Sequence, residues 1–296
     1  MIALNKNNIA FKALQPMFAV VANILLAYIV YFVARVAYLL ENYSLFKEGL
    51  SFEHLIRMFQ GGLMFDTTAI VYSNALYILL MLFPLWFKET NTYHRFCRWL
   101  FVIVNAIGLF LNLCDAVYFP FTLRRTTTSV FREFDNENNL GSIFATELLN
   151  HWYFVLVFVV VVWGMYKLYR MPKSNIFHFN TLKNRWQFVG INFLSLAFAT
   201  VFCVGGARGG LQSGVRPITI SNANEYVKRP IECALVLNTP FALMRTIGKS
   251  IFKVPNTFAS LNNAAKYFTP IHTPNANVKA NKKNVVILIV ESFGRE

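Results

Sequence analysis

The chain has 296 residues, of which 56% are hydrophobic and only 14% are charged, and it contains 30 phenylalanines. Its mean hydropathy is +0.44, and its formal net charge is +14 at pH 7. Soluble globular proteins carry about 25% charged residues, so this composition excludes a soluble protein and indicates an integral membrane protein.

Five segments are long and apolar enough to cross a bilayer. Each has about the twenty residues that a hydrocarbon core about 30 Å thick requires. The first is too long for the core of a signal peptide and is not followed by an Ala-x-Ala-type cleavage site, so we expect an uncleaved first span. Aromatic residues mark several ends, as expected of side chains at headgroup level. The predicted spans are Pro16 to Leu40, Phe65 to Phe87, Trp99 to Phe121, His151 to Tyr169 and Trp186 to Gly206.

Lysine and arginine are distributed unequally between alternate loops. The N-terminus, the second loop and the fourth loop together hold ten basic residues and one acidic residue, whereas the first and third loops hold five basic and seven acidic residues. The positive-inside rule therefore predicts a cytoplasmic N-terminus. Five crossings would place everything after Gly206 on the extracytoplasmic side.

Three ionisable residues lie inside predicted spans, where a charge near the centre costs about 2.5 to 3.5 kcal/mol on insertion scales. Arg35 and Asp66 are near the ends of their predicted spans and could snorkel to the interface at little cost. Asp115 is deeper in its span. It is the better candidate for lining a polar cavity that opens outward.

A pair of arginines, Arg124 and Arg125, follows just beyond the third predicted span. Guanidinium groups bind phosphate oxygens bidentately, so these residues suit a phosphate group. With Asp115 and Arg208 they form our candidate site for a lipid headgroup. The alternative is that the arginines are interfacial anchors and that one of them makes a structural pair with Asp115.

The part of the chain that follows the fifth span, from Ala207 onward, holds twelve basic and four acidic residues. On the outer face it would lie against anionic headgroups or an anionic lipid substrate, and nucleic acid is not expected as a partner there. A solvated linker is the alternative. The sequence GGARGG at 205–210 predicts a flexible exit from the fifth span, because it has too many glycines to continue a helix.

Two short helices are predicted after this exit. Asn222 and Glu225 resemble a capping box, which predicts a helix directly after Asn222. Thr239 and Pro240 predict a second start, with Thr239 as the N-cap. This second helix either lies in the membrane interface or packs against a following soluble domain. Residues 253–283 are predicted to form an extended linker. The apolar residues at helical spacing in the second helix are Phe241, Met244, Ile247 and Ile251.

Near the end of the chain, six apolar residues at 285–290 run without a break and are followed at once by Glu291. This pattern predicts a buried parallel strand with helices on both faces. Ligands of open α/β sheets bind beyond the carboxyl ends of the strands, so Glu291 occupies the position of a metal ligand or catalytic carboxylate. The alternative is an edge strand with a solvated Glu291.

Five stretches occur in a characteristic order, and together they resemble the lipoteichoic acid synthase family, the membrane-anchored branch of the sulfatase and alkaline phosphatase superfamily. The resemblance implies an all-α membrane domain of five transmembrane helices at 1–206 and an extracytoplasmic linker with amphipathic helices at 207–283. It also implies that 284–296 is the first β-strand of a truncated sulfatase-like α/β domain. The stretches are FDTTAI (65–70), DAVYFPFTLRRT (115–126), RGGLQSGVRPI (208–218), NTPFALMRT (238–246) and NVVILIVESF (284–293).

The resemblance implies a function for the parent protein, which would be a phosphoglycerol transferase in the bacterial cell (inner) membrane. Glu291 would be the first ligand of a divalent metal, typically manganese, and a threonine nucleophile would accept a phosphoryl group from an anionic phospholipid headgroup. The nucleophile and the other ligands would lie beyond Glu296. We therefore expect no catalytic residue and no tight metal binding in this chain, which would serve as membrane anchor and linker.

Two other functions remain open. A phosphoethanolamine transferase shares the five-span plan, although the Ser-Phe that follows Glu291 favours the first reading. A non-catalytic multi-pass membrane module would instead use the intramembrane charges. No pair of helices broken by glycine or proline, as found in transporters, is predicted, which counts against this module. The sequence does not identify the donor lipid, the acceptor or the oligomeric state.

Overall fold

The computed structural model describes residues 9–85, 88, 90–134, 139–172, 182–209, 217–248, 263 and 265–268. Every regular element within these ranges is a helix. The chain divides into two compact units, Met1–Lys249 and Ser250–Glu296, and all the helices named below belong to the first. The strand predicted at 285–290 lies outside the described residues, as does most of the linker predicted at 253–283.

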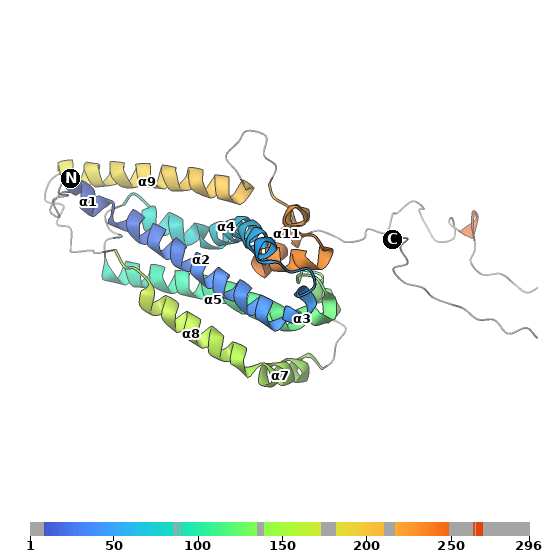
Figure 1. Ribbon diagram of the computed structural model, residues 1–296. Helices are drawn as coiled ribbons and strands as arrows, with labels where there is room; N and C mark the ends of the chain where they lie inside the picture. Colours follow the sequence, from blue (N-terminus) through green and yellow to red (C-terminus); the bar gives the residue numbers. More distant parts are fainter. Residues whose placement is uncertain are drawn as a thin grey trace, which may run out of the picture. The chain divides into compact units, whose positions relative to one another are not determined.

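The helical, multi-pass architecture is confirmed. Four described helices are long and apolar enough to cross a membrane, and a fifth span results if a pair of helices bent by 80° counts as one. All five overlap predicted spans (Figure 1). The four long helices are α2 (Gln15–Glu41), α4 (Phe52–Leu82), α5 (Asn91–Thr122) and α9 (Leu182–Arg208), and the bent pair is α7 (Leu140–Asn150) and α8 (Trp152–Leu168).

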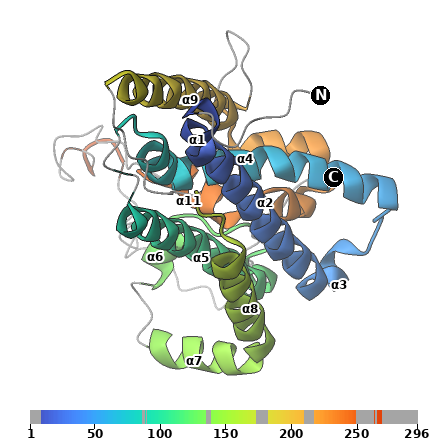
Figure 2. The ribbon, with the colours of Figure 1, turned by 90° about the vertical axis from the view of Figure 1, so that its left-hand side faces the viewer.

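Helices α2, α4 and α5 pack against one another, while α9 and α8 lie on opposite sides of this core (Figures 1 and 2). α9 contacts α4, and α8 contacts α5 and α2. Large apolar side chains of the flanking helices face outward, among them Trp163 and Phe193, which are more than half exposed. Outward apolar faces are what a bilayer requires, because lipid tails are as apolar as leucine.

Helix α4 starts well before the predicted span, at Phe52 instead of Phe65. Its N-cap is Ser51, whose hydroxyl accepts a hydrogen bond of 3.2 Å from the backbone N–H of His54. Hydropathy alone could not show this extension, because polar side chains, among them Glu53, His54 and Arg57, interrupt the apolar residues in the first turns of α4. Asp66 consequently lies in the middle of a long helix and not near a helix end.

The prediction of a flexible exit at 205–210 was wrong for the residues that the structure describes. Helix α9 continues through Arg208 and ends where Gly209 takes a positive φ of 81°. The Gly206 carbonyl accepts a hydrogen bond of 3.0 Å from the Thr68 hydroxyl of α4. A Cβ at Gly206 would lie 2.9 Å from Cγ2 of Thr67. The glycines thus allow α9 and α4 to approach closely.

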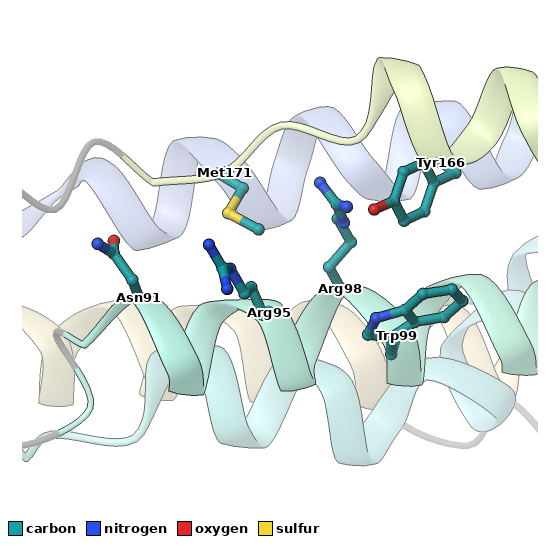
Figure 3. A pocket seen from close by; sticks show the side chains of 6 residues that line it. All are labelled: Asn91, Arg95, Arg98, Trp99, Tyr166 and Met171. Carbon is teal, nitrogen blue, oxygen red and sulfur yellow. The ribbon is translucent and has the colours of Figure 1, made fainter.

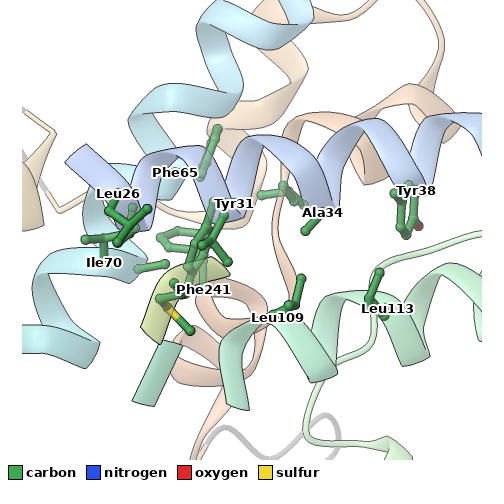
Figure 4. Close-up of a cluster of buried hydrophobic side chains, with 14 of the residues drawn as sticks. Leu26, Tyr31, Ala34, Tyr38, Phe65, Ile70, Leu109, Leu113 and Phe241 are labelled. Carbon is green, nitrogen blue, oxygen red and sulfur yellow. The ribbon is translucent and has the colours of Figure 1, made fainter. Parts of the chain in front are cut away.

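After the break in the described residues at 210–216, the chain returns to the bundle as a series of short helices. Phe241 of the last one is buried among side chains of α2, α4 and α5 (Figure 4). It makes an edge-on contact with Phe65, with ring centroids 5.0 Å apart. The short helices are η2 (Ile220–Tyr226), η3 (Pro230–Glu232), α10 (Cys233–Val236) and α11 (Thr239–Thr246).

Both predicted helix starts in this segment are shifted. The first helix is a 3₁₀ helix capped by Thr219, whose backbone N–H donates to the Asn222 side chain at 2.8 Å. In α11 the N-cap is Asn238, whose side chain accepts from the N–H of Phe241 at 2.8 Å. Helix α11 packs on α4 and α5 and ends before Ile247, which is 69% exposed. The helix therefore does not lie on the surface of the bundle with its apolar face in the membrane interface, and the other alternative, packing against a following domain, concerns residues outside the described ranges.

Three further short helices complete the described elements. The side of the bundle at which α3 follows α2 is called the α3 end, and the opposite side, at which α1 precedes α2, is called the α1 end (Figure 1). The elements are α1 (Ile9–Ala13), α3 (Tyr43–Phe46) and α6 (Val130–Phe134).

Candidate functional site

Two arginine–carboxylate pairs are buried at the α3 end of the bundle. Nη2 of Arg35 lies 2.5 Å from Oδ1 of Asp66, and Nη1 of Arg125 lies 3.0 Å from Oδ2 of Asp115. All four side chains are at most 4% exposed. A buried charge is tolerated only when it is paired and hydrogen-bonded. The four residues, with Asn112, Asn238 and Thr239, are called the buried polar cluster below.

Arg35 of α2 joins the first pair to helix α10. Its guanidinium donates hydrogen bonds to the carbonyls of Leu235, Val236 (2.7 Å) and Leu237 (3.3 Å), and also to the carbonyl of Gly62 in α4 (3.2 Å). The last carbonyls of a helix lack intrahelical partners and carry partial negative charge. Arg35 therefore caps the C-terminus of α10 while it neutralises Asp66.

Two consecutive glycines in α4 make room for these contacts. A Cβ at Gly62 would lie 2.5 Å from Cζ of Arg35, and a Cβ at Gly61 would lie 2.4 Å from Cγ of Tyr226. Glycine inside a helix costs about 1 kcal/mol relative to alanine. A Gly-Gly pair in an apolar helix was the signal that sequence reasoning missed, because such a pair marks a close approach by other groups.

Arg125, which follows α5, joins the second pair to the segment at 217–248, called the returning segment below because it packs back on the bundle after α9. Its Nε donates to the carbonyl of Ala234 at 2.6 Å, and its Nη1 donates to the Thr239 hydroxyl at 3.0 Å as well as to Asp115. The guanidinium also lies over the ring of Tyr38, 3.7 Å from the centroid, where a cation–π attraction adds to the pairing.

Asp115 is satisfied by three further donors. Oδ1 accepts from the backbone N–H of Thr126 at 3.1 Å and also from its hydroxyl, while Oδ2 accepts from the Thr239 hydroxyl at 2.9 Å. Hydrogen bonds to an ionised group are stronger than those between neutral groups. The carboxylate is therefore firmly held in this interior position.

Asn238 and Thr239 connect the two pairs to each other. The Asn238 amide donates to Oδ1 of Asp66 at 2.8 Å. The backbone N–H of Thr239 donates to the side-chain oxygen of Asn112 at 3.1 Å. Because Thr239 uses its hydroxyl to bind Asp115, the capping of α11 is left to Asn238. This division explains why the helix start is shifted by one residue from the prediction.

A third buried pair, between His54 and Glu232, lies at the N-terminal end of α4. Nε2 of His54 is 2.8 Å from Oε2 of Glu232. The same carboxylate accepts from the backbone N–H groups of Lys228 (3.0 Å) and Arg229 (3.1 Å) and from Nε of Arg229 (3.0 Å). Burial alone would raise the pKa of Glu232, but these hydrogen bonds outweigh burial and lower the pKa to about 2.

Replacing Glu232 with glutamine should remove a pH-dependent part of the stability. At pH 7 we expect the free energy of unfolding to fall by about 1.5 to 3 kcal/mol, as for lost hydrogen bonds to a charged group. The folded pKa is depressed, so this contribution is present above the unfolded value of 4.5 and is lost as the pH falls toward about 2. Unfolding in detergent, followed by circular dichroism, measures this difference, and a gap between wild type and variant that is unchanged at pH 2 would contradict the assignment.

The predicted site residues do not all come together. Asp115 and Arg125 form a buried pair, whereas Arg124 is exposed beside it and Arg208 is exposed at the C-terminal end of α9. Nε and Nη1 of Arg125 donate to groups of the protein, so in this arrangement it ties the structure together. The binding of a lipid headgroup by this set stays a prediction. Arg35 and Asp66 do not snorkel to the interface but pair with each other in the interior.

The predicted metal site falls outside the described part of the chain, because it depends on Glu291. Among the described residues, no group of three or more His, Cys, Asp or Glu side chains is placed to hold a metal ion. The role of Glu291 as a manganese ligand therefore stays a prediction.

No protein-family model, curated protein or solved structure matches this chain. Functional inference therefore depends on the residues themselves and on where the fold places them. The strongest such observation is the buried polar cluster, which joins α2, α4 and α5 to the segment that returns after α9.

Proposed function

We propose that this chain is the membrane anchor and linker of a metal-dependent lipid-headgroup phosphotransferase that resembles lipoteichoic acid synthase. One observation carries the proposal. Three of the five stretches behind the resemblance, far apart in the sequence, meet in the buried polar cluster. Asp66 comes from the stretch at 65–70, the pair of Asp115 and Arg125 comes from 115–126, and Asn238 and Thr239 come from 238–246.

The buried polar cluster gives these three stretches a common structural role. It holds the segment up to Thr246 on the ends of α2, α4 and α5, so whatever follows starts from a defined point on the membrane domain. An enzyme that takes a headgroup from the bilayer gains rate when its reacting groups are held close to that surface. With the proposed cytoplasmic N-terminus, the α3 end faces the extracytoplasmic leaflet, and the basic tail would approach anionic headgroups there.

Glu291 would contribute one ligand to the divalent metal of such an enzyme. A bound metal of this kind stabilises negative charge on a transferred phosphoryl group. In our proposal the described residues contribute no catalytic group, and their role is to hold the linker segment up to Thr246 on the membrane domain.

The test is an assay of lipid turnover in membranes of cells that express the source gene. We expect release of diacylglycerol from fluorescent phosphatidylglycerol, dependence on manganese and loss of turnover in Glu291→Ala. Glu296→Ala removes a nearby carboxylate and serves as the matched control, which should retain turnover. Turnover of phosphatidylethanolamine instead would indicate the phosphoethanolamine transferase reading, and a fully active Glu291→Ala enzyme would refute the role of Glu291.

A further inference from the structure

A second polar region lies at the α1 end of the bundle, far from the buried polar cluster along the helices. The first turns of α5 and the end of α8 line an open cavity of about 590 Å³. Binding sites for small molecules commonly have about 300 to 1,000 Å³. The cavity is lined by Asn91, Arg95, Arg98, Trp99, Tyr166 and Met171 (Figure 3).

The two arginines of this cavity differ from the arginines of the buried polar cluster. Figure 3 shows Arg95 and Arg98 side by side on α5, both directed toward the chain at the end of α8. Within the described ranges, neither guanidinium makes a hydrogen bond or an ion pair. Arg98 lies over the ring of Tyr166, with Cζ 3.7 Å from the centroid, and its Nε is buried without a hydrogen-bond partner.

This arrangement is costly without an anion. The exposed Arg95 and the half-buried Arg98 place two like charges on one helix face. The Nε of Arg98 is a buried donor without a partner among the described residues, whereas buried polar groups in native proteins almost always have one. Arg35 and Arg125 meet the same requirement with carboxylates and carbonyls. A ligand that brings negative oxygens into the cavity would supply what the described residues do not supply to Arg95 and Arg98.

We propose that this cavity binds a phosphate group, carried either by a phospholipid headgroup or by a soluble phosphate ester. Guanidinium groups match phosphate oxygens in charge and in bidentate geometry. Trp99 and Tyr166 are the kind of amphipathic side chain found at headgroup depth. The site does not depend on the function proposed above, because it lies at the opposite end of the helices.

The cavity is accessible both to a lipid from the bilayer and to a soluble phosphate ester from the aqueous side. Trp99, which lines it, is 52% exposed, and the neighbouring Phe96 on α5 is 56% exposed. These apolar surfaces would accompany the acyl chains of a lipid whose headgroup enters the cavity. A soluble phosphate ester would instead enter from the aqueous side, where the polar side chain of Asn91 is exposed.

The experiment compares two probes on the purified full chain in detergent. Phosphatidylglycerol binding is measured by native mass spectrometry, and glycerol 3-phosphate binding by quenching of tryptophan fluorescence. In the double variant Arg95→Gln and Arg98→Gln, the affinity for the bound probe should fall by about tenfold or more, because charge-assisted hydrogen bonds are lost. The control, Lys167→Gln with Lys183→Gln, removes two exposed charges outside the cavity lining and should bind as the wild type does.

The outcomes distinguish the sources of phosphate. A loss confined to phosphatidylglycerol identifies a lipid site, and a loss confined to glycerol 3-phosphate identifies a site for soluble esters. Equal affinity of wild type and the arginine variant for both probes overturns the proposal. If the variant does not fold, arginine modification by phenylglyoxal in the wild type gives the answer. Either probe should protect Arg98 but not the distant, exposed Arg57, and absence of protection by both probes also overturns the proposal.

Discussion

Replacing Arg35 with methionine should lower the free energy of unfolding by about 3 to 5 kcal/mol, the usual cost of breaking a buried ion pair by removing one partner. The Asp66 carboxylate would remain buried with the Asn238 amide as its described side-chain donor. The carbonyls at the end of α10 would also lose their common donor. Unfolding in detergent, followed by circular dichroism, measures the loss.

Two further variants make this result specific. Arg35→Met combined with Asp66→Leu removes both charges and should recover most of the stability, because replacing a whole buried pair by apolar groups is often neutral or stabilising. Arg57→Met is the matched control, since this exposed arginine donates to the Glu225 carbonyl at 2.6 Å and its loss should cost about 1 kcal/mol or less. If the double variant is no more stable than Arg35→Met, the ion pair with Asp66 is not the interaction through which Arg35 stabilises the fold.

Replacing Asp115 with asparagine should have an effect of similar size, about 3 kcal/mol or more. The substitution keeps the shape of the side chain but leaves the Arg125 guanidinium buried without its counter-ion. Because Arg125 and Asp115 both hold Thr239, we expect the segment at 217–248 to detach locally before the long helices unfold. Faster tryptic cleavage after Lys228 and Arg245, with the far-UV signal retained, is the expected result.

The same experiment separates a structural role of this pair from a role in headgroup binding. Glu147→Gln removes an acidic side chain that is 37% exposed and should leave tryptic cleavage unchanged. If Asp115→Asn also cleaves at the wild-type rate but retains less phosphatidylglycerol in native mass spectrometry, the pair acts mainly on lipid. Faster cleavage with unchanged lipid retention would identify the pair as a tie between α5 and the returning segment.

The positions of the long helices could be predicted because membrane insertion leaves a strong local signal in hydropathy. The partners of the intramembrane charges could not be predicted, because a pair such as Arg35 and Asp66 depends on which faces of two helices meet. The predicted span that starts at Phe65 also placed Asp66 near a helix end, whereas the observed helix begins at Phe52, which makes Asp66 central. Opposite charges in neighbouring spans were nevertheless a usable signal for pairing.

The returning segment was predictable in part. Helices near Asn222 and Pro240 are present, but their caps and their packing differ from the prediction because long-range contacts decide both. Thr239 would be a good N-cap in isolation, yet its hydroxyl binds Asp115, which no local pattern reveals. The environment of α11 likewise follows from the burial of Phe241 against Phe65.

The buried polar cluster also has a consequence for biosynthesis. Its members come from α2, α4, α5 and the segment after α9, so the first three parts enter the membrane before the ribosome has made Asn238 and Thr239. Until then, Asp115 lacks the Thr239 hydroxyl, and Arg35 lacks the carbonyls at the end of α10. The buried charges of α2, α4 and α5 therefore gain their full set of hydrogen bonds only after the segment at 217–248 has been synthesised and has packed on them.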